Sequence, residues 1–162
     1  MFAAACQAFL FTALLTAGLI KLADRDRFLR TLAGLPWLPL RVARPSARAI
    51  PLLELTVAFM LVAAPRIGAG ASLGLLAAFT AVVGHELAAG RRFRCGCFGG
   101  AGTRPVGVDA LLRNGLLVAA TLVILVLPYT FAPAAMVTGF GLGLLLVLYE
   151  IGAETLDLAR SQ

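Results

Sequence analysis

Charged residues are scarce in this chain, and their scarcity excludes an ordinary soluble domain. Only 14% of the 162 residues are charged, whereas 60% are hydrophobic and the mean hydropathy is +0.95. A soluble domain has a charged fraction of about 25%. The few charges also stand between long apolar runs instead of being spread along the chain. The composition is therefore typical of an integral membrane protein.

Several recognisable signals are also absent. No tract of lysine and arginine alternates with aromatic residues, so the net charge of +6 does not indicate nucleic-acid binding. Basic residues in the loops between membrane spans account for it instead. The segment Met1–Ile20 lacks a positive amino-terminal region, which favours a retained first helix over a cleaved signal peptide. The chain also shows no lipidation signal and no convincing internal repeat.

The apolar runs predict an all-α membrane protein with a single domain. We expect a bundle of about five transmembrane helices, a four-helix core plus one, with a basic interfacial loop after the first helix. An uncharged run over residues 114–149 would be about 54 Å long as one helix, whereas the hydrocarbon core is about 30 Å thick. Pro128 and Pro133 divide this run into two spans. The predicted spans are residues 2–22, 47–64, 67–87, 106–127 and 131–150.

Two local features concern packing at the membrane. The basic segment Ala23–Ala49 contains a short apolar stretch broken by prolines, which predicts an interfacial position with Trp37 at headgroup level. GxxxG patterns begin at Gly70 and Gly139 in the third and fifth spans. They are typical of close helix contacts, but small residues are also common in membrane helices without such a role.

The charge distribution bears on membrane orientation. With five spans, Arg66 alone lies on one side, and every other lysine and arginine lies on the side of the first and third loops. The positive-inside rule then places residues 91–105 at the cytoplasmic face of a multi-pass protein, which we expect in the bacterial cytoplasmic membrane. Residues 91–105 also contain two cysteines, and because disulfides persist mainly outside the cytoplasm, the opposite orientation stays open.

The most specific local feature is the pair of cysteines in Cys95-Gly96-Cys97, within an arginine-rich loop. A disulfide across this spacing closes a small ring, and strained disulfides are labile. Nearby arginines favour the reactive thiolate. The alternatives are half of a metal site with His85, or cysteines that the loop merely tolerates. Cys6 lies near the start of the first span, on the membrane face opposite to Cys95 and Cys97, and is expected to be a packing residue.

Polar residues gather on the same membrane face as this pair. Glu54 lies inside a predicted span, where it needs a partner or a polar cavity, and Lys21 and Arg113 are available at that depth. The carboxylate either forms a structural ion pair or moves protons during redox chemistry. His85 is a candidate general base or an ordinary residue at a helix end. Asn114 could orient a loop carbonyl or a ligand.

Taken together, these residues resemble the methylamine-utilisation MauE family, within the wider DoxX-like group of small membrane proteins. The resemblance covers most of the chain. Its most specific part is the Cys-Gly-Cys-Phe-Gly element followed by Arg-Asn. The matching elements are Lys21 with Phe28, Glu54, Arg91, Cys95-Gly96-Cys97-Phe98-Gly99 and Arg113-Asn114.

The resemblance implies a membrane thiol–disulfide oxidoreductase that matures exported proteins. Cys95 and Cys97 would exchange disulfides with a thioredoxin-like partner or a disulfide-containing client. A lipid-soluble carrier such as quinone would couple the reaction, although no quinone motif is present. Lys21, Glu54, Arg113 and Asn114 would form the adjacent polar pocket. Independently of the resemblance, His85 stays a candidate general base for the thiols. Two alternatives remain: a non-catalytic assembly or chaperone subunit, and a small transporter using Glu54 and Arg113.

Overall fold

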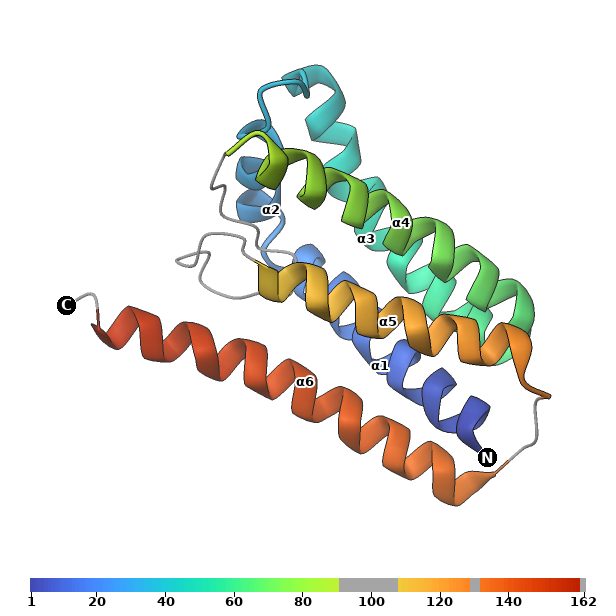
Figure 1. The fold of residues 1–162 in the computed structure, drawn as a ribbon. Helices are drawn as coiled ribbons and strands as arrows, with labels where there is room; N and C mark the ends of the chain where they lie inside the picture. Colours follow the sequence, from blue (N-terminus) through green and yellow to red (C-terminus); the bar gives the residue numbers. More distant parts are fainter. Residues whose placement is uncertain (91–107, 129–131, 161–162) are drawn as a thin grey trace.

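The fold is a bundle of α-helices (Figure 1). The computed structural model describes residues 1–90, 108–128 and 132–160, and these ranges contain helices and no strand. The helices are α1 (Phe2–Ala23), α2 (Arg25–Ala33), α3 (Leu40–Ala63), α4 (Pro65–Ala88), α5 (Val108–Val126) and α6 (Pro133–Arg160). The expected all-α architecture is confirmed.

Length and composition suit these helices to a bilayer. Helices α1, α3 and α4 are each long and apolar enough to cross a membrane. Helices α5 and α6 contain shorter apolar stretches, Ala110–Val126 and Pro133–Tyr149. At 1.5 Å per residue, each of these stretches rises about 25 Å, close to the hydrocarbon thickness. The structure is therefore that of a helical membrane bundle.

Four helices form the core of the bundle, and a fifth packs outside it. Helix α1 contacts α3, α3 contacts α4, α4 contacts α5, and α5 returns to α1. Helix α6 packs along α1 (Figure 1). The interior between the four core helices is filled by apolar residues that include Leu10, Leu61, Leu76 and Leu117. This arrangement corresponds to the predicted four-helix core plus one.

Glycines bring two pairs of helices close together. Any side chain at Gly143 of α6 would begin 2.7 Å from Thr12 of α1, and Gly139 approaches the α1 backbone in the same way. The GxxxG pattern of the last helix is therefore a packing feature. In α4 the close approach is made by Gly68 against Leu61 of α3, whereas the pattern that starts at Gly70 faces open space.

The turn between α3 and α4 uses a proline and a buried glutamine. Pro65 begins α4, where its fixed backbone angle suits a first helical residue. It has no N–H, so the carbonyl of Leu61 loses the donor that a continuing helix would supply. The side chain of Gln7 on α1 donates from Nε2 to this carbonyl at 2.6 Å. A buried polar group that the turn leaves open is thus satisfied from a neighbouring helix.

The segment expected as a basic interfacial loop is largely helical. Helix α2 starts where the side chain of Asp24 accepts a hydrogen bond from the Arg27 backbone N–H, a typical N-cap. Helix α3 begins at Leu40, earlier than the span predicted from residue 47, and contains Pro45 and Pro51. A small separate core joins α2, the connection and the start of α3. It consists of Phe28, Leu32, Leu35, Ala43 and Ala47.

Candidate functional site

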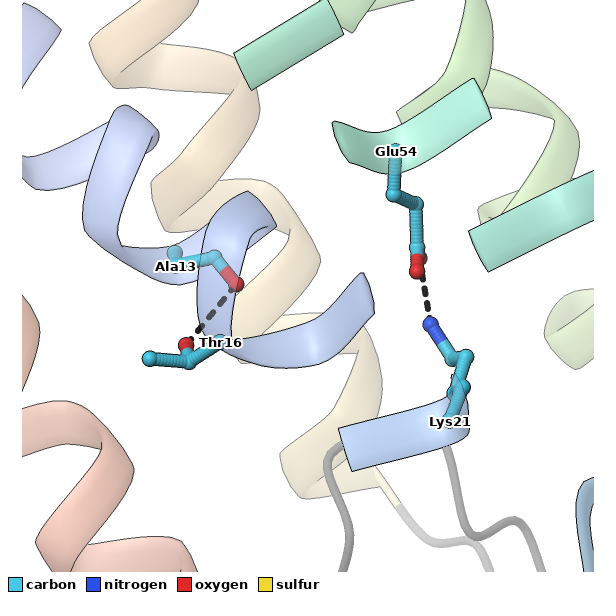
Figure 2. Close-up of polar contacts among 4 residues, drawn as sticks. All are labelled: Ala13, Thr16, Lys21 and Glu54. Atoms are coloured by element: carbon cyan, nitrogen blue, oxygen red, sulfur yellow. Dashed lines mark hydrogen bonds and ion pairs between the residues drawn. The ribbon is translucent and has the colours of Figure 1, made fainter. Parts of the chain in front are cut away.

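A buried ion pair links two core helices near one end of the bundle. The ammonium of Lys21, in the last turn of α1, donates to Oε1 of Glu54 on α3 (Figure 2). Lys21 is 2% exposed and Glu54 is 1% exposed. Of the two cations predicted to be available to Glu54, Lys21 is therefore the one that binds it. Thr16, one turn earlier, uses its hydroxyl on the α1 backbone instead.

Aromatic rings surround the ammonium group of Lys21. Its Nζ lies 5.0 Å from the ring centroid of Phe79 on α4 and 5.6 Å from that of Phe28 on α2. Both distances allow cation–π attraction, which strengthens when the cation is removed from water. The short helix α2 is thus the element that closes the end of the bundle over the pair. Sequence reasoning missed Phe79, because an aromatic residue in an apolar helix carries no distinguishing signal.

Arg113 and Asn114 lie in the second turn of α5. Arg113 is close enough to Lys21 for the two positive charges to repel each other. Asn114 is 4% exposed and donates from Nδ2 to the hydroxyl of Thr80 on α4 at 3.2 Å. The family resemblance implied one polar pocket for four residues. These residues lie at the same end of the bundle on three of its core helices: Lys21, Glu54, Arg113 and Asn114.

The second carboxylate oxygen of Glu54 is not engaged by Lys21. Oε2 is buried and forms no hydrogen bond to any described residue. A buried carboxylate oxygen without a donor is costly, because water no longer solvates it. It can accept a hydrogen bond or a proton from a group that enters the site. The arrangement can therefore do more than hold two helices together.

A second buried carboxylate lies at the end of α4. Glu86 is 1% exposed, and its Oε1 accepts a hydrogen bond from Nε1 of Trp37 at 2.8 Å. Trp37 is about half exposed, and its ring meets that of His85 edge to face at 6.4 Å. Glu86 thereby fixes the connection between α2 and α3 to α4. Sequence reasoning placed Glu86 only at a helix end and did not propose this role.

The predicted catalytic residues fall in two groups. Glu54 and His85 are described, and the side chain of His85 is exposed next to Trp37 rather than part of the buried pair. Cys95 and Cys97 lie outside the described residues, as does the metal alternative that would involve them. Cys6 is a free, half-buried thiol that packs against the main core, which agrees with its predicted packing role.

The chain position of residues 91–107, which contain Cys95 and Cys97 and are termed the cysteine segment, shows which end of the bundle the segment joins. It follows α4, which ends at Ala88, and precedes α5, which begins at Val108. Its two ends therefore leave the bundle at the end where Glu86, Arg113 and the Lys21–Glu54 pair are found.

Comparison with known proteins supports the resemblance seen in the sequence. The family model described as "Methylamine utilisation protein MauE" matches residues 1–128, which include α1 to α5, the Lys21–Glu54 pair and the Cys-Gly-Cys element. No curated protein and no solved structure matches the chain. Because the family model covers more than half of the sequence, this chain is a membrane protein of the methylamine-utilisation MauE family.

Proposed function

We propose that this protein is a membrane thiol–disulfide oxidoreductase in which Cys95 and Cys97 form the exchanging pair. The observation that carries the proposal is the buried Lys21–Glu54 ion pair, with Arg113 beside it, at the end of the bundle where the cysteine segment begins and ends. Ionisable residues inside a membrane bundle are costly and usually serve function. Thiol exchange needs proton acceptors and positive charge next to the sulfur atoms.

The exchange proceeds through a mixed disulfide. The thiolate of one cysteine attacks a disulfide of a thioredoxin-like partner or client, and the second cysteine then attacks the mixed disulfide. The partner disulfide is reduced to two thiols, and Cys95 and Cys97 are oxidised to a disulfide. The two protons released by Cys95 and Cys97 balance the two that the partner sulfurs take up. The reverse direction oxidises the partner, and either direction requires both cysteines.

The charged residues of the bundle would manage the protons of this reaction. Oε2 of Glu54 is buried and free to accept a proton, while Lys21 holds the other carboxylate oxygen in place. His85, exposed at the end of α4, is the second candidate proton acceptor. For repeated turnover the cysteine pair needs an electron carrier in the membrane. When the pair has oxidised a partner and is left as a dithiol, quinone fits this requirement, since quinone and dithiol yield quinol and disulfide. When the pair has reduced a partner and is left as a disulfide, quinol would supply the two electrons and two protons that restore the dithiol.

The proposed function also bears on the membrane in which the protein lies and on its orientation there. We place the protein in the bacterial cytoplasmic membrane, where a partner with a thioredoxin-like domain reaches the loop after α4. Charge distribution favours a cytoplasmic loop, and oxidation of exported proteins favours an external one. Labelling single-cysteine variants with a membrane-impermeant maleimide in intact cells and in inverted vesicles decides between the two.

The direct test of the proposal is a redox titration of the two thiols in native membranes. In a Cys6→Ala background, a maleimide mass tag is added with and without prior mild reduction. We expect two tags to appear only after reduction, and Cys95→Ser and Cys97→Ser variants each to gain a single tag without reductant. Two results together would contradict the proposal and favour the assembly role. The thiols would label equally with and without reductant, and both serine variants would still support maturation of the exported client.

A further inference from the structure

The first turns of α3 carry three arginines on one exposed face. At 100° per residue, the exposed residues of this face lie within an arc of about 80°, so they form one line along the helix, which we term the outer strip of α3. The change from basic to apolar residues occurs once along this line. In chain order, the outer strip consists of Arg41, Arg44, Arg48, Leu52, Phe59 and Val62.

The three guanidinium groups of the outer strip lack an anionic partner in the described part of the chain. The ion pairs found there join Lys21 to Glu54 and Arg27 to Asp24, and neither involves the strip. The arginines are exposed, so water or an external anion must satisfy them. Because arginine presents a planar fork of donors, phosphate is a well-matched anion.

The positions of the outer-strip residues along the axis of α3 match the hydrocarbon core and the polar layer of a bilayer. Leu52 and Phe59 are 54% and 61% exposed and suit contact with acyl chains. Along the helix axis, Arg44 lies about 6 Å and Arg41 about 10 Å beyond Arg48. The polar layer on each side of the hydrocarbon core is about 5–8 Å thick, and arginine side chains can extend toward it. When Leu52 contacts the chains, Arg48 and Arg44 therefore fall at the depth of the phosphates, and Arg41 reaches that depth by extending its side chain back toward it.

A proline supports this placement of the membrane surface. Pro45 lies within the basic part of α3 and has no N–H, so the carbonyl of Arg41 loses its donor in the helix. An unsatisfied carbonyl in hydrocarbon costs several kcal/mol, as a rough value, whereas water and headgroups satisfy it in the polar layer. The first turns of α3 thus belong outside the hydrocarbon.

We propose that the outer strip of α3 is a binding site for an anionic phospholipid. Its phosphate is held by Arg41, Arg44 and Arg48, and its acyl chains lie along Leu52 and Phe59. A phospholipid has an anionic headgroup followed by hydrocarbon chains. The outer strip has arginines followed by apolar side chains, so the two sequences of groups match. An acidic protein would complement the arginines but leave the apolar continuation of the same line unused. The site is separate from the thiol chemistry proposed above.

Retention of lipid by the purified full-length protein tests the site. The protein is equilibrated in mixed micelles with equal amounts of phosphatidylglycerol and phosphatidylcholine, washed, and analysed for retained lipid by mass spectrometry. We expect the wild type to retain phosphatidylglycerol preferentially. Each arginine contributes up to about fivefold to such a preference. Arg41→Gln, Arg44→Gln and Arg48→Gln together should abolish it. The corresponding three lysine substitutions keep the charges but lose the planar fork of donors, so they should preserve only part of it.

Controls separate this site from general charge and from folding. Arg66→Gln removes an exposed arginine at the opposite end of the bundle and should leave the preference unchanged. Should the triple glutamine variant fail to fold, as judged by thermal unfolding, Arg44→Gln alone is compared with Arg66→Gln. Equal preference in wild type and strip variants would overturn the proposal. Displacement of phosphatidylglycerol by an equal concentration of inorganic phosphate would overturn the assignment to a lipid.

Discussion

Removing one partner of the Lys21–Glu54 pair should destabilise the protein far more than removing both. Lys21→Met replaces the ammonium with an apolar group of similar length and leaves the Glu54 carboxylate buried without its cation. Both residues are almost fully buried, so solvent does not screen the loss. Breaking a buried pair in this way costs about 3–5 kcal/mol. That is a large part of a total stability of about 5–15 kcal/mol.

The double variant Lys21→Met with Glu54→Leu removes both charges and fills a similar volume. Buried pairs replaced by apolar residues are often neutral or stabilising, so we expect the double variant to unfold near the wild-type midpoint. The assay is equilibrium unfolding by sodium dodecyl sulfate in mixed micelles. The fluorescence of Trp37, the single tryptophan, reports the transition.

A surface ion pair of the same chain provides the control. Arg27 and Asp24 approach to 3.6 Å, but their side chains are 27% and 53% exposed. Arg27→Gln should therefore cost no more than about 1 kcal/mol. Two results would refute the reasoning about the buried pair: a cost of Lys21→Met as small as this control, or a double variant that loses the sum of both single effects.

Three further predictions concern the contacts that hold the helices together. Gly143→Val should separate α6 from α1 and lower the unfolding midpoint, whereas Gly141→Val, which faces open space, should leave the midpoint unchanged. Gln7→Leu leaves a buried carbonyl of α3 without a donor and should cost about 1–3 kcal/mol in the same unfolding assay. Trp37→Phe removes the donor to Glu86 and should increase proteolysis between α2 and α3, and normal protease resistance would contradict this role.

The fold was largely predictable because long apolar runs dominate the sequence. Their lengths and prolines predicted the all-α bundle and its four-helix core plus one. Helix α2 was not predicted, since nine residues rich in arginine carry little helical signal of their own. Its stability comes from the Asp24 cap and from Phe28 and Leu32, which pack on the start of α3. Such packing between elements is not visible in the local pattern.

The sequence predicted which residues gather at the candidate site, but not which side chains bind each other there. A glutamate within an apolar span demands a cation, and the sequence offered both Lys21 and Arg113 at the right depth. The selection of Lys21 depends on side-chain direction, which the bundle determines. The hydrogen bond from Trp37 to Glu86 joins residues that are 49 positions apart, so no local sequence pattern predicts it. The roles of Cys95 and Cys97 stay predictions that thiol labelling must test.

Stability and proposed catalysis share the same residues, so the loss of activity in a single variant at Lys21 or Glu54 has two explanations. The charge-free double variant separates them. If Glu54 serves only the fold, restoring stability with apolar residues should also restore disulfide exchange by the cysteine pair. If Oε2 of Glu54 accepts a proton during the reaction, the stable double variant should still lose exchange, because neither methionine nor leucine can carry that proton. We expect the second result, because Oε2 of Glu54 is buried and has no donor among the described residues, so it can accept a proton. Thiol labelling of the folded double variant at several times after mild reduction measures this directly, and reoxidation at the wild-type rate would assign the pair to the fold alone.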